Sequence, residues 1–297
     1  MFRIFAMVIL FTLYACAHTQ HAGIQKTPGM ITIPQGWFTM GSADGEDNEQ
    51  PLHEVYVDTF EIDRHEVSAD QFAEFLNSRG NPKEIFFSHD PYSTIIRATS
   101  LQGKHPEGED TSELYLPREG YANFPANNVS WYGAFAYCQW RGKRLPTEAE
   151  WEKTARGDDK RTYPWGNSMP DGSKARFNQT WNDKGLNVMV PVDALPGGTS
   201  YYGAFNMAGN VWEWVDTWYQ RHYCKDCPEG EDNPCLPCKQ EDACSHCPAA
   251  IPTEGDFKVL RGGSWYDSYG EIVVRSSYRY WLHPEDRFIH TGFRCAQ

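Results

Sequence analysis

Long uninterrupted runs of Leu, Ile and Val are scarce in this chain of 297 residues, and it has no basic cluster. The scarcity of aliphatic runs argues against a helical bundle and against a doubly wound parallel sheet. The lack of a basic stripe, with a formal net charge of −13, excludes nucleic acid as an expected partner. The sequence also has no internal repeat and no coiled-coil heptad.

Aromatic residues, glycine and proline supply what the aliphatic runs do not. The chain has 11 Trp, 16 Tyr and 16 Phe, spread among 25 Gly and 19 Pro. Together these numbers favour a loop-rich fold held together by aromatic side chains. The length allows one large domain or two small ones.

The N-terminus predicts export. Residues 1–15 have one positive charge, Arg3, before an uncharged apolar stretch too short to span a bilayer as a helix, which is typical of a signal peptide. Leu13-Tyr14-Ala15-Cys16 resembles a bacterial lipobox, which implies cleavage before Cys16 and its acylation. Residues 16–29 then form a lipidated tether. We expect a membrane-anchored lipoprotein of the bacterial cell envelope, facing the periplasm or the outer surface. The alternative is an ordinary signal peptide with an incidental Cys16.

Local patterns predict several elements. Residues 36–42 and 53–60 alternate like strands. Three helices are expected, each opened by a capping residue. The first helix is capped by Ser68 with Gln71 and ends near Gly80. The second is capped by Ser130 and ends at Gly142. The third is capped by Thr147 with Glu150, and Trp151 is its first buried anchor. Residues 81–120 predict a long loop, and residues 261–265 and 275–280 a pair of strands across the core.

The stretch Gly209-Asn210-Val211-Trp212-Glu213-Trp214 is the densest motif. In an extended segment the two Trp side chains share one face and Glu213 points to the other. The carboxylate of Glu213 and the amide of Asn210 offer hard oxygen ligands. The alternative is a strand with a buried Trp pair and a hydrogen-bonded glutamate.

Seven motifs follow one another in a recognisable order: GWFTMGS, RLPTEAEW, YPWGN, GNVWEW, RGGSW, RSSYR and GFR. This order resembles the formylglycine-generating enzyme family, the sulfatase-modifying factor domain. The resemblance covers residues 30–297. It implies one compact α+β domain of low regular secondary structure, related to the C-type lectin fold.

The resemblance also implies two calcium sites. One would use Glu213, with Asn210 close by and the backbone carbonyls of Gly209 and Val211. The other would use Asn178, Gln179, Asp183 and Leu186. In the second site the family's aspartate aligns with Lys184, one residue from Asp183. Asn178 and Asp183 can equally be solvated loop residues.

The catalytic thiols of the family have no counterpart here. The enzyme form resembles a copper oxidase that uses two thiols between its GGS and YRY motifs, because soft Cu(I) prefers thiolates. The stretch from Ser264 to Tyr280 holds no cysteine; Asp267 and Ser277 occupy the two positions. We therefore expect no copper oxidase chemistry of the standard kind. Other residues expected at the family's cleft are Arg275, Tyr278 and Arg279, although these can also form a structural strand pair with arginines bridging acids.

Eight of the nine cysteines remain to be assigned after Cys16. Cys138 and Cys295 match a disulfide of the family, the alternative being two buried thiols. An insert, residues 222–250, contains three CxxC pairs: Cys224 and Cys227, Cys235 and Cys238, Cys244 and Cys247. Such pairs can form disulfides, bind zinc or iron as thiolates, or exchange thiols. The acidic residues that flank them disfavour a reactive thiolate.

Three functions stay open at this point. The first is a non-oxidase envelope lipoprotein that binds a protein, peptide or glycan partner. The second is an oxidoreductase related to the formylglycine-generating enzymes, or a maturation factor for an exported enzyme, with altered active-site chemistry. The third is a metal or thiol accessory working through the insert. Whether the protein is an enzyme is therefore undecided by the sequence.

Overall fold

The computed structural model describes residues 27–98, 114–181, 184–221, 223 and 256–297. The predicted signal peptide, Cys16, Asp183 and the six insert cysteines lie outside the described residues. Lipidation, the chemistry of the insert and the domain boundaries therefore stay predictions. Within the described ranges, no helix combines the length and the apolar composition needed to cross a membrane.

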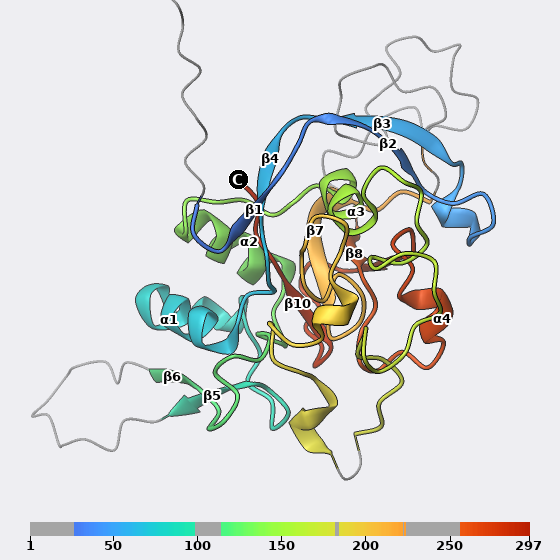
Figure 1. The fold of residues 1–297 in the computed structure, drawn as a ribbon. Helices are drawn as coiled ribbons and strands as arrows, with labels where there is room; N and C mark the ends of the chain where they lie inside the picture. Colours follow the sequence, from blue (N-terminus) through green and yellow to red (C-terminus); the bar gives the residue numbers. More distant parts are fainter. Residues whose placement is uncertain (1–26, 99–113, 182–183, 222, 224–255) are drawn as a thin grey trace, which may run out of the picture.

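A four-stranded sheet lies at the centre of the molecule (Figure 1). Its strands, in spatial order, are β10 (Thr291–Phe293), β7 (Trp212–Trp218), β8 (Lys258–Arg261) and β9 (Arg279–Leu282). β10 runs parallel to β7, and the other two pairs are antiparallel. The GNVWEW motif thus continues into a central strand, and the GFR motif lies directly beside it.

The strands predicted at 261–265 and 275–280 are found at shifted positions. β8 begins three residues before the first predicted strand, and β9 begins four residues after the start of the second. The observed pair is β8 with β9, in the register Arg261 to Arg279. β8 ends at Arg261 because Gly262 and Gly263 have φ values of +97° and +75°, which bend the chain out of the sheet. Residues 262–278 therefore form a connection rather than a strand pair.

Three two-stranded pairs surround the sheet. They are β1 (Met30–Ile33) with β4 (Phe60–Asp63), β2 (Gly36–Met40) with β3 (His53–Val57), and β5 (Ile95–Ala98) with β6 (Leu114–Pro117). The β2–β3 pair confirms the two predicted N-terminal strands. The prediction of one long loop over residues 81–120 is wrong at β5 and β6, whose pairing is not visible in a local pattern.

The predicted helix starts are confirmed. α1 (Ala69–Arg79) and α3 (Glu148–Arg156) begin with complete capping boxes, and α2 (Trp131–Trp140) begins at Ser130. α1 ends at Gly80, as expected, whereas α2 ends two residues before Gly142. The remaining helical turns are α4 (Gly270–Val273), η1 (Asp47–Glu49), η2 (Pro82–Glu84), η3 (Gly185–Val188) and η4 (Pro196–Gly198).

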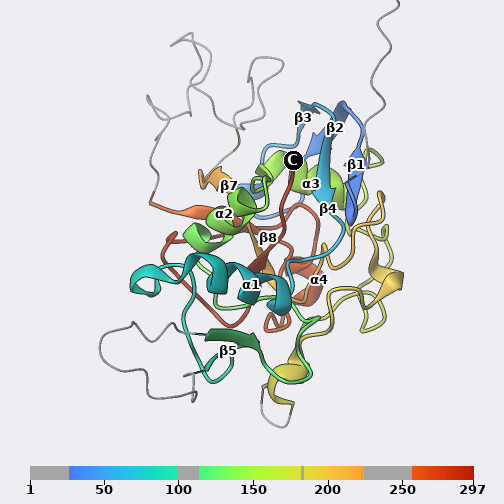
Figure 2. The same ribbon diagram turned by 90° about the vertical axis from the view of Figure 1, so that its left-hand side faces the viewer.

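Two aromatic-rich cores use opposite faces of β7. Trp212 and Trp214 belong to the core that α1 and α2 build in front of the sheet (Figure 2). Val215 belongs to a second core, with Trp151 of α3 and the N-terminal strands. The predicted alternation of the motif is thus confirmed, and so is a compact α+β fold of low regular secondary structure.

Candidate functional site

Glu213 lies on the face of β7 opposite the two tryptophans. One carboxylate oxygen accepts hydrogen bonds from Arg294 Nε at 2.7 Å and from Trp151 Nε1 at 2.8 Å. The other accepts from Arg294 Nη2 at 2.6 Å. Glu213 and Arg294 are almost completely buried, so their charges compensate each other in a medium of low dielectric.

A second buried carboxylate, Glu66, adjoins this pair. Its oxygens accept hydrogen bonds from the side-chain amides of Asn206 at 2.9 Å and Asn210 at 3.0 Å. Burial and the neighbouring Glu213 raise the pKa of Glu66 to about 8, although Arg294 and the two amides oppose that rise. Glu66 was not found from the sequence, since 147 positions separate it from Glu213 and no local pattern links them.

The residues predicted to hold calcium have other partners in this structure. Both oxygens of Glu213 accept hydrogen bonds, and the Asn210 carbonyl accepts one from Trp265 N at 2.9 Å. At the second predicted site, the resemblance implies the backbone carbonyl of Gln179 as the ligand; the side-chain oxygen of that residue accepts a hydrogen bond from Lys184 Nζ at 2.6 Å. A calcium ion at Glu213 would share its oxygens with Arg294. Calcium binding stays a prediction.

The described residues of the second predicted site instead support the RGGSW turn. The N–H of Asn178 donates to the Asp267 carbonyl at 2.9 Å, and that of Gln179 donates to the Trp265 carbonyl at 2.7 Å. Leu186 is buried in a small core that also contains Val211 and Trp265. Across the described part of the chain, no three His, Cys, Asp or Glu side chains gather as a metal-binding group.

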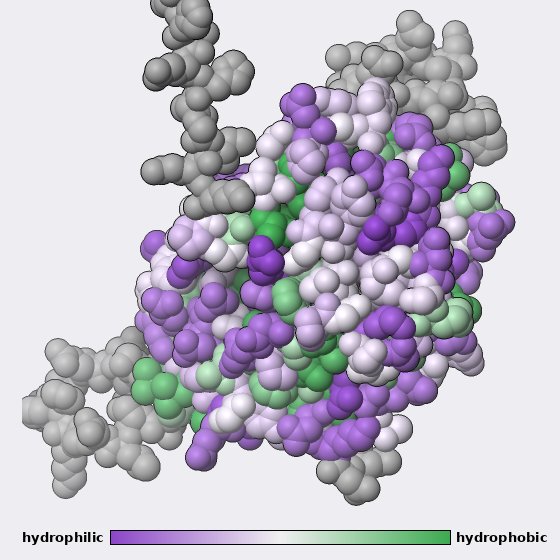
Figure 3. All heavy atoms as spheres, in the orientation of Figure 1, coloured by the Kyte–Doolittle hydropathy of each residue, from purple (hydrophilic) through white to green (hydrophobic). Residues whose placement is uncertain are grey.

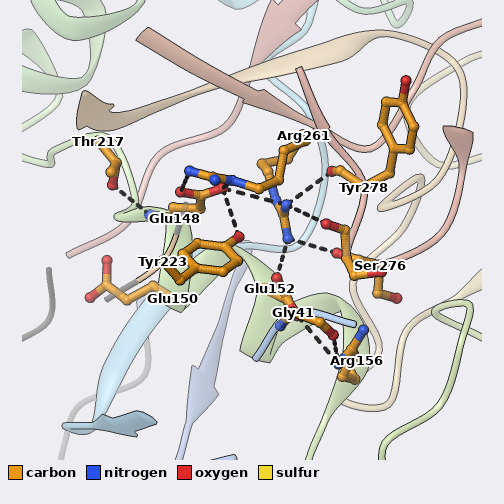
Figure 4. A network of polar contacts seen from close by, with 12 residues as sticks. Gly41, Glu148, Glu150, Glu152, Arg156, Thr217, Tyr223, Arg261, Ser276 and Tyr278 are labelled. Atoms are coloured by element: carbon orange, nitrogen blue, oxygen red, sulfur yellow. Dashed lines mark hydrogen bonds and ion pairs between the residues drawn. The ribbon is translucent and has the colours of Figure 1, made fainter. Parts of the chain in front are cut away.

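A larger ion-pair network joins α3 to β8 and β9 (Figure 4). Glu148 of α3 pairs with Arg279 at 2.6 Å, and Glu152 pairs with Arg261. Although burial raises the pKa of Glu148, Arg279 and Arg261 together hold it below its usual value. Both arginines are buried, so Arg279, expected at the cleft, is a structural residue here.

Arg261 also holds the segment that carries Ser277. It donates to the carbonyls of Ser276 at 2.7 Å, Ser277 at 2.9 Å and Tyr278 at 2.9 Å. Ser277 is only 2% exposed. The position of the family's second thiol is therefore fixed by the ion-pair network and closed to solvent.

Asp267, at the first thiol position, closes the RGGSW turn. Its Oδ2 accepts hydrogen bonds from the backbone N–H of Ser264 at 2.8 Å and from the Ser264 hydroxyl at 2.7 Å. Arg275, on the same connection, pairs with the buried Glu49 at 2.6 Å. Of the five residues expected at the cleft, Asp267 and Tyr278 are half-buried, and the charge of Asp267 acts on the Tyr278 phenol. Arg275 and Arg279 instead neutralise internal acids.

Rings that the sequence did not single out as site residues lie near Asp267, whose charge acts on Tyr280 and His290. His290 stacks on Tyr266, with centroids 5.8 Å apart, and on Phe288, with centroids 5.4 Å apart. Tyr280 stacks on Trp212 at 5.2 Å. We call Asp267, Tyr278 and these five rings the Asp267 cluster. Its members come from β7, β9 and the two flanking connections, so only the fold brings them together.

The electrostatics of the Asp267 cluster favour neutral side chains around one carboxylate. Burial lowers the pKa of His290, while Asp267 opposes that effect. Burial also raises the pKa of Tyr278 and Tyr280, and Asp267 adds to both shifts. The imidazole Nδ1 of His290 is buried and has no hydrogen-bond partner in the part of the chain that the structure describes. A neutral imidazole and two phenols near one carboxylate can exchange hydrogen bonds or a proton with a ligand.

The described cysteines form a disulfide. Cys138 of α2 and Cys295, two residues after β10, are linked, with their Cα atoms 5.6 Å apart. The bridge spans 157 positions of sequence and joins α2 to the C-terminus beside the central sheet. It lies in the first core.

Several known proteins are similar to this chain in sequence. The family model of the sulfatase-modifying factor enzyme 1-like domain matches residues 16–297. The formylglycine-generating enzyme of Mus musculus is 35% identical over 90% of this chain and 74% of its own length. The inactive C-alpha-formylglycine-generating enzyme 2 of Bos taurus is 31% identical, over 92% of this chain and 89% of its own.

A solved structure agrees with these relatives. PvdO from Pseudomonas aeruginosa superposes with a TM-score of 0.61 at 26% identity, covering 90% of this chain and 93% of its own.

Proposed function

Because the chain belongs to the sulfatase-modifying factor family of formylglycine-generating enzymes, we propose that it is an exported member that binds a partner without copper oxidation by paired thiols. The partner is a protein, peptide or glycan of the cell envelope, and it binds at the Asp267 cluster. One observation carries this proposal: the two thiol positions hold Asp267, which caps a turn, and Ser277, which is closed to solvent.

Exposed rings support the choice of surface. Tyr266 is 64% exposed, Tyr269 69% and Phe288 42%. Aromatic side chains at a protein surface provide binding area at little entropic cost, and they are enriched in interfaces. The face shown in Figure 3 carries mostly hydrophilic residues with small hydrophobic patches between them.

The remaining parts of the proposal come from the sequence. Lipidation at Cys16 anchors the domain to a bacterial membrane, and calcium at Glu213 stabilises the scaffold. The insert cysteines form disulfides in the oxidising envelope. Metal content and thiol titration of the mature chain test the last point, since bound zinc or iron on free thiolates would favour an accessory role instead.

A site-specific photocrosslinker tests partner binding. We replace Tyr266 with a photoreactive phenylalanine in cells that express the full chain, and we place the same probe at exposed Tyr201 as the control. The proposal expects one discrete adduct from position 266, which Asp267→Ala weakens, and none from position 201. Copper-dependent conversion of a cysteine peptide to the aldehyde by the purified chain would contradict the proposal.

One observation favours a second function, an enzyme with altered chemistry. The neutral His290 lies within electrostatic reach of Asp267, and its buried Nδ1 has no hydrogen-bond partner among the described residues; it can act as a general base for a substrate that binds against it. A reaction that depends on this base is lost in His290→Gln and shows a pH profile that Asp267→Asn shifts. If partner binding is intact in His290→Gln while no such reaction is found, the binding function stands alone.

A further inference from the structure

A polar pocket opens between β4, α1 and the end of α2, and it shares no residue with the Asp267 cluster. Its volume is about 200 Å³, enough for a small organic molecule. Its wall includes Asp63, Glu66, Asn123, Tyr137, Arg141 and Lys143.

Glu66, one of the two acids in this wall, has no ion-pair partner of its own among the described residues. Glu66 is 2% exposed, and two amides donate to its oxygens. Arg294, the nearest guanidinium, is engaged by both oxygens of Glu213. Glu66 and Glu213 therefore share one positive charge, and with a pKa of about 8 Glu66 is mostly protonated at neutral pH. A cation in the pocket would favour and compensate its ionised form.

The cations at the rim do not supply that charge. Lys143 Nζ lies 2.5 Å from Asp63, and Arg141 lies 3.9 Å from Glu74 on α1. Each thus has a carboxylate partner already. The rim is balanced, whereas the floor at Glu66 is short of one positive charge.

Two neutral oxygens can complete a site for a cation with N–H groups. Tyr137 is 3% exposed, and its hydroxyl makes no hydrogen bond within the described part of the chain. The charges of Arg141 and Asp63, both in the wall, act on that hydroxyl, which places it at the pocket. The amide of Asn123 donates to Asp193 at 2.8 Å, so its oxygen is left as an acceptor.

We propose that this pocket binds a small organic molecule through a primary ammonium group, with Glu66 as its counter-ion and Tyr137 and Asn123 as neutral acceptors. An ammonium group has three N–H donors, which match these three side chains. The pocket is far larger than a bare ion, and among the described residues no metal-binding group of three His, Cys, Asp or Glu is present. An amine therefore fits better than a metal ion.

Calorimetric titration of the full mature chain with n-butylammonium chloride tests the proposal. Sodium butyrate and 1-butanol serve as anionic and neutral probes, and calcium chloride is added afterwards as a competitor. Among the three organic probes we expect saturable binding of the amine alone, and we expect that calcium does not displace it. Glu66→Gln keeps the shape of the side chain and is expected to weaken binding about tenfold or more, since it removes a charged hydrogen-bond partner.

Matched variants separate binding from folding. Tyr137→Phe keeps the buried ring and is expected to weaken amine binding about threefold, and it serves as the test if Glu66→Gln does not fold. Glu74→Gln, at the exposed rim, leaves binding unchanged. Equal binding of 1-butanol, displacement of the amine by calcium, or full affinity in Tyr137→Phe and Glu66→Gln overturns the proposal.

Discussion

Two buried networks in this protein use the same residue types with opposite charge balance. Around Glu213, two carboxylates share the single guanidinium of Arg294. Around Glu148, two carboxylates contact three arginines, the third being Arg156, 3.4 Å from Glu152. The shifts follow the balance, because the pKa of Glu66 is raised and that of Glu148 is lowered.

This difference in charge balance distinguishes a network that stabilises the fold from one that can bind a ligand. In the Glu148 network each carboxylate has its own arginine partner, and Arg261 also binds the carbonyls that hold the connection after β8. A network short of one cation is stabilised by anything that supplies it. We therefore assign the Glu148 network to the fold and the surroundings of Glu66 to binding.

The largest effect is expected from Arg261→Met. This change leaves Glu152 without its principal partner in a fully buried position and frees three carbonyls, so unfolding should become easier by about 3–5 kcal/mol. Chemical denaturation monitored by Trp fluorescence measures the loss. Arg161→Met, which removes a surface pair with Asp159, is the control and should cost less than about 1 kcal/mol. Similar losses in the two variants would mean that the network is not a structural centre.

A smaller effect is expected from Glu213→Gln. The variant loses a charged partner for Arg294, but Glu66 remains to compensate that arginine, so the loss should be about 2–3 kcal/mol. The predicted calcium site gives a second readout. A calcium chelator should lower the melting temperature of the wild type and leave that of Glu213→Gln unchanged. A wild-type melting temperature that does not respond to the chelator removes calcium from the proposal, while the ion pair with Arg294 stands.

Sequence reasoning reached the parts of this architecture that depend on neighbouring residues. The caps at Ser68, Ser130 and Thr147 act within one helical turn, so they were found correctly. The alternation of Trp212 and Glu213 was also found, because it follows from strand geometry. The end of β8 was missed, since the paired strands were placed beyond the two glycines that turn the chain.

The residues that decide the site depend on contacts across the whole chain. Glu66 reaches Glu213 only after β4 and β7 are in place, and His290 reaches Tyr266 only after β10 pairs with β7. Neither contact leaves a local signal. The family resemblance supplied the position of Asp267, but it could not show that Ser264 holds its carboxylate in a turn.

Lys258 gives the finest test, because it is a buried cation compensated mainly by aromatic rings. Its Nζ lies 4.1 Å from the Trp131 ring centroid and 3.9 Å from that of Trp218, and it donates to the Asp216 carbonyl at 2.8 Å. Burial lowers the pKa of Lys258 to about 8, whereas the partly exposed Asp216 opposes that shift. The folded protein thus binds fewer protons at this site than the unfolded chain between pH 8 and about 10.5.

It follows that the wild type should gain stability relative to Lys258→Met as the pH rises through that window. The proton on Lys258 stabilises the unfolded chain more than the folded protein, and this difference becomes smaller as the pH rises. We expect a relative gain of about 1–2 kcal/mol between pH 7.5 and pH 10, measured as the difference between two denaturation series so that other groups cancel. A constant difference would show that the two indole rings keep the ammonium charged. Aromatic rings would then stabilise a buried ammonium group as well as a carboxylate does. The rings near the Glu66 pocket would in that case have to be included when the stabilisation of a bound cation there is assessed.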